Sequence, residues 1–298
     1  MGSGTFSARS LAAYCCTTGA MYDHATGRVS NQTFKSVQID PSLDPKRFTI
    51  RECVNSDEHP KTVPVILALD VTGSMGPACR ETAAALGIII TNLYKKFKDI
   101  EFCVMGIGDL AYDDAPIQMS QFESDVRIAE ALDKIYIEGG GGGNAFESYT
   151  AAWYMGLKRT KLDAIEKDER KGVIITMGDE PLNPYLPVRQ LNESIGASEQ
   201  SDIDTKWLYQ QVIEKFDVYH ISVDDPNDCY QYRKKDIDDS FGQLLGENYK
   251  ISTINGLAET IEECITDSVE KNFAIPCTGI LNEDNSDPTY NENGEIVW

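Results

Sequence analysis

Residues 65–76 read VILALDVTGSMG. The apolar run Val63–Leu69 is continuous, which is typical of a strand buried on both faces of a parallel sheet. It is followed by Asp70 and then by two hydroxyl residues at a spacing of two, Thr72 and Ser74. Three oxygen-bearing side chains therefore lie on one turn at the end of a predicted buried strand. Such hard ligands favour Mg²⁺, Mn²⁺ or Ca²⁺ over zinc or copper.

From this run onward, predicted strands alternate with predicted helices. The predicted strands are 63–69, 101–108, 116–122, 172–177, 217–223 and 249–254, and an antiparallel orientation is open for the short edge strand 116–122. The predicted helices are 81–98, 124–135, 145–159, 187–195, 204–216, 230–245 and 257–271. Strands that alternate with helices of this length form βαβ units. The sequence therefore predicts an α/β fold: a doubly wound, mainly parallel sheet with helices on both faces.

The pattern divides the chain into three parts. Residues 1–62 are polar and irregular, and we expect an extended arm with edge strands at 36–39 and 47–51. Residues 63–278 form the predicted sheet domain. Residues 279–298 form an acidic tail that is rich in Asn and Asp and could dock on the body or on a partner. The arm and the tail leave self-assembly open as a role.

The charge of the chain restricts its partners. Asp and Glu number 48 against 27 Lys and Arg, which gives a net charge of −21 and a pI near 4.5. Such a chain repels phosphate backbones, so nucleic acid and anionic membranes are disfavoured as partners. Cations and basic protein surfaces are favoured.

Several absences favour a cytoplasmic location. The sequence has no apolar stretch of the roughly 18–20 residues that span a bilayer, and its first residues lack the pattern of a secretory signal. The eight cysteines show no C-x-x-C spacing, and Cys103 and Cys264 lie inside predicted elements. This usage predicts buried free thiols in a reducing compartment rather than disulfides or a zinc site.

Three loops with oxygen donors are expected to meet at one edge of the sheet, because ligands of open α/β sheets bind beyond the carboxyl ends of the strands. The first loop follows strand 63–69, the third carries Asp179 after strand 172–177, and the second combines the run Gly139–Gly143 with Asn144 before a helix. The glycines do not follow the first strand and no Walker A lysine is present, which argues against a nucleotide-binding Rossmann domain. They favour backbone that passes close to an ion or partner, or a flexible loop.

This combination resembles the von Willebrand factor A domain and its metal-ion-dependent adhesion site, whose first loop reads Asp-x-Ser-x-Ser. The resemblance covers about residues 63–275 and includes the order of strands and helices. Asp70 and Ser74 match the motif, Thr72 keeps the hydroxyl of the first serine, and Asp179 stands at the position of the family's third-loop aspartate.

The second loop departs from the family pattern, which has a threonine after Gly-Gly. Asn144 is the first candidate for that ligand position and Glu147 the second; a contact through water, or no ligand from this loop, is also open. Asp109, at the end of the strand 101–108, could orient waters or a hydroxyl around the ion. An ordinary turn aspartate is an equal interpretation of Asp109.

The resemblance implies a non-catalytic, Mg²⁺-dependent protein-interaction module, with Mn²⁺ or Ca²⁺ as possible substitutes. Thr72 and Ser74 would bind the ion directly, and Asp70 and Asp179 would hold it partly through waters. Two neutral hydroxyls leave the ion under-neutralised, so an open coordination position can accept an Asp or Glu carboxylate of a partner. We expect that carboxylate to lie within an otherwise basic surface.

Two other functions stay open at this point. The arm and tail could make the chain a structural subunit of a larger assembly. A haloacid-dehalogenase-like phosphohydrolase also has an aspartate after its first strand, but it needs a second aspartate as acid and base two residues later, where this chain has Thr72. Nucleophilic catalysis has little support: of the three histidines, His24 and His59 lie in the arm, and His220 lies in an apolar strand.

Overall fold

A computed structural model of the chain describes residues 4–30, 34, 36–138, 146–225 and 229–272. It also describes the backbone of two short paired strands, β13 (Thr289–Tyr290) and β14 (Ile296–Val297). The second-loop residues 139–145, Asn144 among them, and most of the predicted acidic tail lie outside the described residues.

Six strands of the described residues form one central sheet in the order β12–β11–β8–β4–β5–β6. They are β4 (Val63–Asp70), β5 (Ile100–Ile107), β6 (Ile117–Met119), β8 (Gly172–Gly178), β11 (Phe216–Val223) and β12 (Tyr249–Ser252). All neighbours pair in parallel except the edge strand β6, which is antiparallel to β5. Every residue of β4 is buried, as its continuous apolar sequence predicts. The predicted doubly wound, mainly parallel sheet is confirmed.

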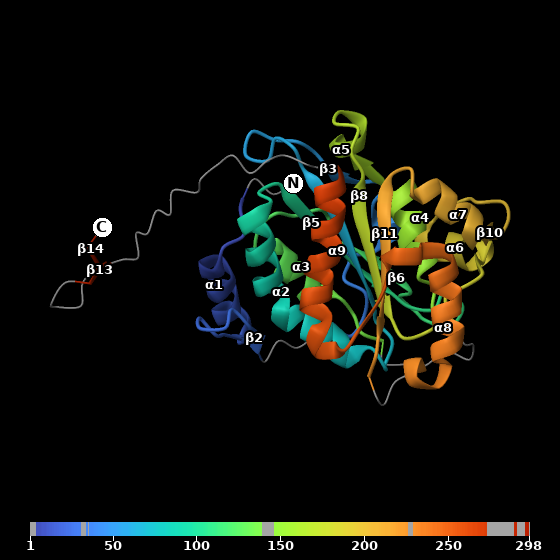
Figure 1. The fold of residues 1–298 in the computed structure, drawn as a ribbon, viewed down its shortest axis with the longest axis horizontal. Coiled ribbons are helices and arrows are strands. Elements are labelled where there is room, and N and C mark those ends of the chain that lie inside the picture. The colour runs from blue at the N-terminus through green and yellow to red at the C-terminus, as the bar shows by residue number, and fades with distance from the viewer. Residues whose placement is uncertain are drawn as a thin grey trace.

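Helices cover both faces of this sheet (Figure 1). One face carries α2 (Gly76–Lys96), α3 (Arg127–Lys134) and α9 (Leu257–Asn272). The other face carries α4 (Thr150–Lys158), α6 (Val188–Ile195), α7 (Thr205–Val212) and α8 (Cys229–Leu245). Successive side chains of a strand point to opposite faces, so Leu67 and Leu69 pack in the first layer while Ile66 and Ala68 pack in the second. Each predicted helix corresponds to one of these seven, with shifted ends.

Residues 8–30 do not form the expected extended arm. They form α1 (Ala8–Thr18) and a small hairpin of β1 (Met21–Tyr22) and β2 (Val29–Ser30). A capping box starts the helix, because Ser7 Oγ accepts the N–H of Ser10 at 3.1 Å and Ser10 Oγ accepts the N–H of Ser7 at 3.2 Å. The expectation failed because this helix depends on two buried residues, Leu11 and Cys15, too few to give a clear periodic signal.

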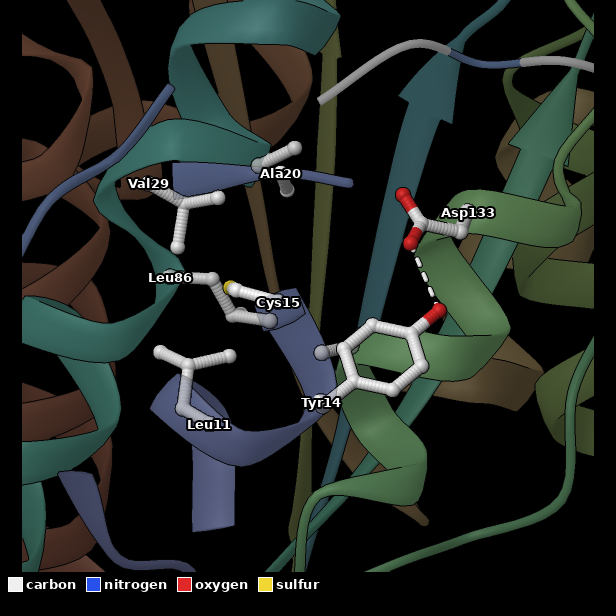
Figure 2. A pocket seen from close by; sticks show the side chains of 9 residues that line it. Leu11, Tyr14, Cys15, Ala20, Val29, Leu86 and Asp133 are labelled. Atoms are coloured by element: carbon white, nitrogen blue, oxygen red, sulfur yellow. Dashed lines mark hydrogen bonds between the residues drawn. The ribbon is translucent and has the colours of Figure 1, made fainter. Parts of the chain in front are cut away.

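Helix α1 packs against α2 and α3 on one face of the domain (Figure 2). The hydroxyl of Tyr14 donates a hydrogen bond to Asp133 Oδ2 of α3 at 2.6 Å, while Leu11, Val29 and Leu86 close over the apolar space beside it. That space leaves no room for a water molecule. Helix α1 and the β1–β2 hairpin therefore pack against the domain core.

Short elements account for the remaining differences from prediction. Residues 36–39 form no strand, and the strand expected at 47–51 is displaced to β3 (Arg51–Cys53), which pairs with β7 (Thr160–Leu162). Strands of three residues are too short for a periodic pattern to identify. The other short elements are η1 (Pro45–Arg47), α5 (Asp163–Glu166), β9 (Tyr185–Leu186), β10 (Ile203–Asp204), η2 (Gly246–Asn248) and η3 (Ile254–Gly256).

Two further findings concern membrane spans and cysteines. Among the residues that the structure describes, none of the helices combines the length and the apolar composition that a membrane span needs. The cysteines of the same residues are free thiols, and most of them are buried, as predicted.

Candidate functional site

Three loops meet at the carboxyl edge of the sheet. The strand order reverses between β4 and β8, and in doubly wound sheets this switch point is where ligands bind. Asp70 ends β4, Asp179 directly follows β8, and Asp109 follows β5 by two residues. All three carboxylates are buried. The sheet topology therefore brings together the side chains that the sequence singled out on the first and third loops.

The first loop folds around the carboxylate of Asp70. The backbone N–H and the hydroxyl of Thr72 both donate to Asp70 Oδ1, at 2.9 Å and 2.5 Å. The other carboxylate oxygen accepts the hydroxyl of Tyr149 at 2.8 Å. Because the O–H of Thr72 donates its hydrogen bond to the carboxylate, the lone pairs of the hydroxyl oxygen are left for an electropositive ligand.

Ser74 connects the first loop with the third. Its hydroxyl lies 3.3 Å from Asp179 Oδ1 in donor geometry, and the N–H of Cys229, at the start of α8, donates to Asp179 Oδ2 at 3.2 Å. Ser74 is exposed, whereas Asp179 is fully buried. The hydroxyl of Ser74 therefore lies at the solvent-facing side of the group, with the carboxylate behind it.

The electrostatics of this group favour a cation. Burial, followed by the charge of Asp179, raises the pKa of Asp70 to about 7. Burial also raises the pKa of Asp179. Two buried carboxyl groups that repel each other are stabilised in their charged form by a divalent ion between them. Carboxylates with hydroxyls are the donor set that Mg²⁺ and Ca²⁺ prefer.

Glu147 adds a second-loop carboxylate to the group. Its side chain is 7% exposed, and no described residue provides a hydrogen-bond partner for Oε2. Burial, with the charge of Asp70 next, raises its pKa to about 10. A buried carboxylate oxygen without a partner is rare, and a cation would satisfy it. Of the two candidates for the second-loop ligand, Glu147 is the one whose position the structure gives.

Asp109 behaves as a turn residue. Its Oδ1 accepts the N–H of Ala111 at 2.8 Å, and its own N–H donates to Asp113 Oδ2 at 2.7 Å. Asp109 nevertheless belongs to the electrostatic environment of the site, because its charge is among those that raise the pKa of Glu147. The geometry fits the turn interpretation directly; a role around an ion stays a prediction.

Sequence reasoning missed Tyr149. Its hydroxyl donates to Asp70 and accepts the N–H of Glu180 at 3.2 Å, so it bridges the first and third loops. Gly178 makes this possible, since a Cβ there would lie 2.0 Å from the Tyr149 oxygen. The ring packs edge-on against His220, at 5.0 Å between centroids. In sequence, Tyr149 is an ordinary apolar residue of a predicted helix, and no local pattern marks it.

The acidic side chains of the described residues do not form a metal site by themselves. Within the described ranges, no set of three or more His, Cys, Asp or Glu side chains is arranged to hold a metal ion. Asp70, Asp179 and Glu147 are therefore not arranged as such a set, and the candidate site depends on the hydroxyls of Thr72 and Ser74, which contact Asp70 and Asp179. Its residues fit a divalent cation by donor chemistry and by the orphaned oxygen of Glu147.

The sequence matches no model of a protein family and no curated protein. Solved structures that are similar to this chain include the pilus adhesin SpaC from Lactobacillus rhamnosus GG in its open conformation, at 12% identity and a TM-score of 0.45 over 72% of this chain and 31% of SpaC. They also include the vWF domain of the type V pili tip protein Mfa5 from Porphyromonas gingivalis, at 10% identity and a TM-score of 0.41 over 69% of this chain and 95% of that domain. The chain thus spans under a third of the length of SpaC.

Proposed function

We propose that this chain is a von Willebrand A-type domain that binds a divalent cation, Mg²⁺ in the first place, and through it a carboxylate of a partner protein. Thr72 and Ser74 would bind the ion directly, Asp70 and Asp179 would hold it partly through waters, and Glu147 would supply the second-loop carboxylate. A cytoplasmic location and a basic surface around the partner's carboxylate are parts of the same proposal.

The observation that carries the proposal is the contact between Ser74 and Asp179. These residues are 105 positions apart, yet Ser74 Oγ lies 3.3 Å from Asp179 Oδ1. Thr72 makes the corresponding contact with Asp70. Each hydroxyl donates to a carboxylate, so both hydroxyl oxygens keep lone pairs for an ion, and the carboxylates behind them supply the negative charge.

The bound ion would supply a Lewis-acid position that accepts a partner's carboxylate. The other contributions to binding come from residues of this chain. Tyr149 fixes the carboxylate of Asp70, and the exposed side chain of Ser74 leaves the site open to solvent. Two neutral hydroxyls lower the ion's charge less than carboxylates in their place would, so its affinity for an external anion is preserved.

A catalytic function receives less support from the geometry. Both carboxylate oxygens of Asp70 accept hydrogen bonds and the residue is fully buried, so neither oxygen is presented as a nucleophile. Thr72, at the position where a haloacid-dehalogenase-like enzyme has its second aspartate, donates to Asp70 instead of acting as an acid.

The assembly alternative receives less support from the N-terminal segment. Residues expected to form part of an extended arm pack in the core through Leu11 and Cys15. The predicted tail stays open as an assembly element, because most of it lies outside the described residues. Adhesion or another protein interaction remains the function that the site supports best.

Calorimetric titration with Mg²⁺ and Mn²⁺ tests the proposal. The wild-type chain should bind one ion at the site. Ser74→Ala should weaken binding by about tenfold or more, because it removes a ligand from an exposed position without opening a core cavity. Asp70→Ala should abolish it, and the exposed Ser201→Ala is the matched control that should bind as the wild type does. Equal heats from the wild type and Asp70→Ala would refute the site.

A further inference from the structure

The basic side chain of Arg233 in α8 lies beside the candidate site. Its Nη1 is 2.7 Å from Glu180 Oε2, in the loop that carries Asp179. Its guanidinium carbon is 5.8 Å from the ring centroid of Phe146, which precedes Glu147 in the second loop. Arg233 therefore contacts two of the three loops that form the site.

The shape of α8 holds Arg233 at this position. The residue has non-helical backbone angles, φ −122° and ψ 15°, and so marks a kink between the first turn of α8 and the rest. The first turn is attached to the site by the N–H of Cys229, which donates to Asp179 Oδ2. The side chain of Arg233 is therefore attached at the point where α8 changes direction, next to the third loop.

The negative charge around the site explains why a positively charged side chain would help a partner's carboxylate to bind. Asp70, Asp179, Glu147 and Glu180 gather at the ends of β4 and β8, and an approaching carboxylate meets their negative field. The side chains of Arg233 and Glu180 are 25% and 21% exposed, so the pair lies within reach of a partner. A guanidinium carries five N–H donors in a planar fork and can bind a second carboxylate beside Glu180.

We propose that Arg233 and the ring of Phe146 form a docking surface for an acidic side chain of a partner that is followed by an aromatic or large apolar residue. This inference rests on the proposed function: the ion takes one oxygen of the partner's carboxylate and Arg233 takes the other. Phe146 is 37% exposed. Its ring, beside Arg233, gives the apolar neighbour a surface on which to pack.

A dipeptide probe tests the inference on the full chain. N-acetyl-aspartyl-phenylalanine amide is titrated into Mn²⁺-loaded protein, and the broadening of its proton NMR signals by the bound ion gives its affinity. The asparagine analogue serves as the neutral probe. We expect the aspartyl probe to bind at least about tenfold more tightly than the analogue, because only a carboxylate engages both the ion and the guanidinium.

The variant Arg233→Ala should lower the affinity for the aspartyl probe about tenfold or more while its Mn²⁺ affinity stays within about twofold of the wild type. Arg233→Lys, which keeps the charge without the fork, should show an intermediate loss. Lys234→Ala is the matched control, because it removes the same charge from the next residue. Lys234 forms an ion pair with Asp238 at 3.1 Å, and the variant should bind the probe as the wild type does.

The outcomes separate this inference from the proposed function. If the wild type binds no Mn²⁺, the proposed function fails and the docking surface fails with it. If Mn²⁺ binds but the wild type and Arg233→Ala take the probe equally, or the wild type takes no probe, the docking surface is refuted and the ion site stands. A parallel loss of Mn²⁺ and probe in Arg233→Ala would show that Arg233 supports the ion site, which also overturns the inference.

Discussion

The hydroxyl group of Tyr149 helps to stabilise the meeting point of the first and third loops. The hydroxyl of Tyr149 donates to Asp70 Oδ2 and accepts the N–H of Glu180, and the residue is 1% exposed. The ring is held by His220, which itself stacks on Phe241 at 3.5 Å between centroids. Tyr149 therefore links the packing of the core to the geometry of Asp70.

Removal of that hydroxyl should affect both stability and ion binding. We expect Tyr149→Phe to lower the free energy of unfolding by about 1–3 kcal/mol, because a buried carboxylate oxygen and a partly buried N–H both lose their partner. Mn²⁺ affinity should also fall. Urea unfolding without metal and calorimetry with Mn²⁺ provide the two measurements. Tyr112→Phe, at a side chain 58% exposed, is the control; an equally small effect of both substitutions would contradict the bridging role.

At the scale of elements, α1 is the clearest case of a segment whose structure depends on its neighbours. Leu11 is 2% exposed and packs close to Gly87 of α2, where an added Cβ would lie 2.6 Å from Leu11 Cδ2. Figure 2 shows Leu11 facing Leu86 and Val29, with Tyr14 and Asp133 joining α1 to α3. The helix therefore docks by close packing and by the hydrogen bond between Tyr14 and Asp133.

We expect Leu11→Ala to lower the free energy of unfolding by about 2–5 kcal/mol, because it leaves a cavity in a packed interface. Val37→Ala, at a side chain 85% exposed, should change it by less than about 0.5 kcal/mol. Denaturant unfolding followed by circular dichroism compares the two. If Leu11→Ala unfolds like the wild type, the N-terminal segment would be a detachable arm after all.

At the scale of the whole molecule, stability depends on a large negative charge and on buried carboxyl groups away from the site. The net charge of −21 makes the folded state repel itself. Glu101 of β5 is 3% exposed and accepts a hydrogen bond from the thiol of Cys53 at 3.2 Å. Burial raises its pKa from 4.5 to about 7. The folded chain therefore keeps a proton that the unfolded chain releases between these two values.

This difference gives a pH dependence with a definite sign. Because the pKa is raised on folding, the contribution of Glu101 to stability is lost as pH rises from about 4.5 to about 7, at up to about 1.4 kcal/mol per pH unit. Glu101→Gln should remove that slope, so the variant should gain relative to the wild type from pH 5 to 7. Urea unfolding at pH 5, 6, 7 and 8 tests this, with the exposed Glu247→Gln as control; parallel curves for all three proteins would disprove it.

Local sequence patterns predicted the central strand and the main helices of the fold. The continuous apolar run Val63–Leu69 identified a buried central strand, and helical periodicity located the main helices within a few residues. The motif Asp70-x-Thr72-x-Ser74 and the position of Asp179 after a strand placed two loops at one edge. These features follow from the sequence because burial, helical period and turn chemistry act over a few neighbouring residues.

Only the tertiary structure decided which distant groups meet. The contacts Tyr149–Asp70, Ser74–Asp179 and Arg233–Glu180 join residues 79, 105 and 53 positions apart. The helix α1 likewise depends on surfaces of α2 and α3 that its own sequence does not contain. Such contacts result from strand order and close packing between layers, and these long-range interactions leave no periodic trace in a single sequence. The sequence by itself thus determined a doubly wound sheet with a motif rich in oxygen donors, while the structure decided how those oxygens are held.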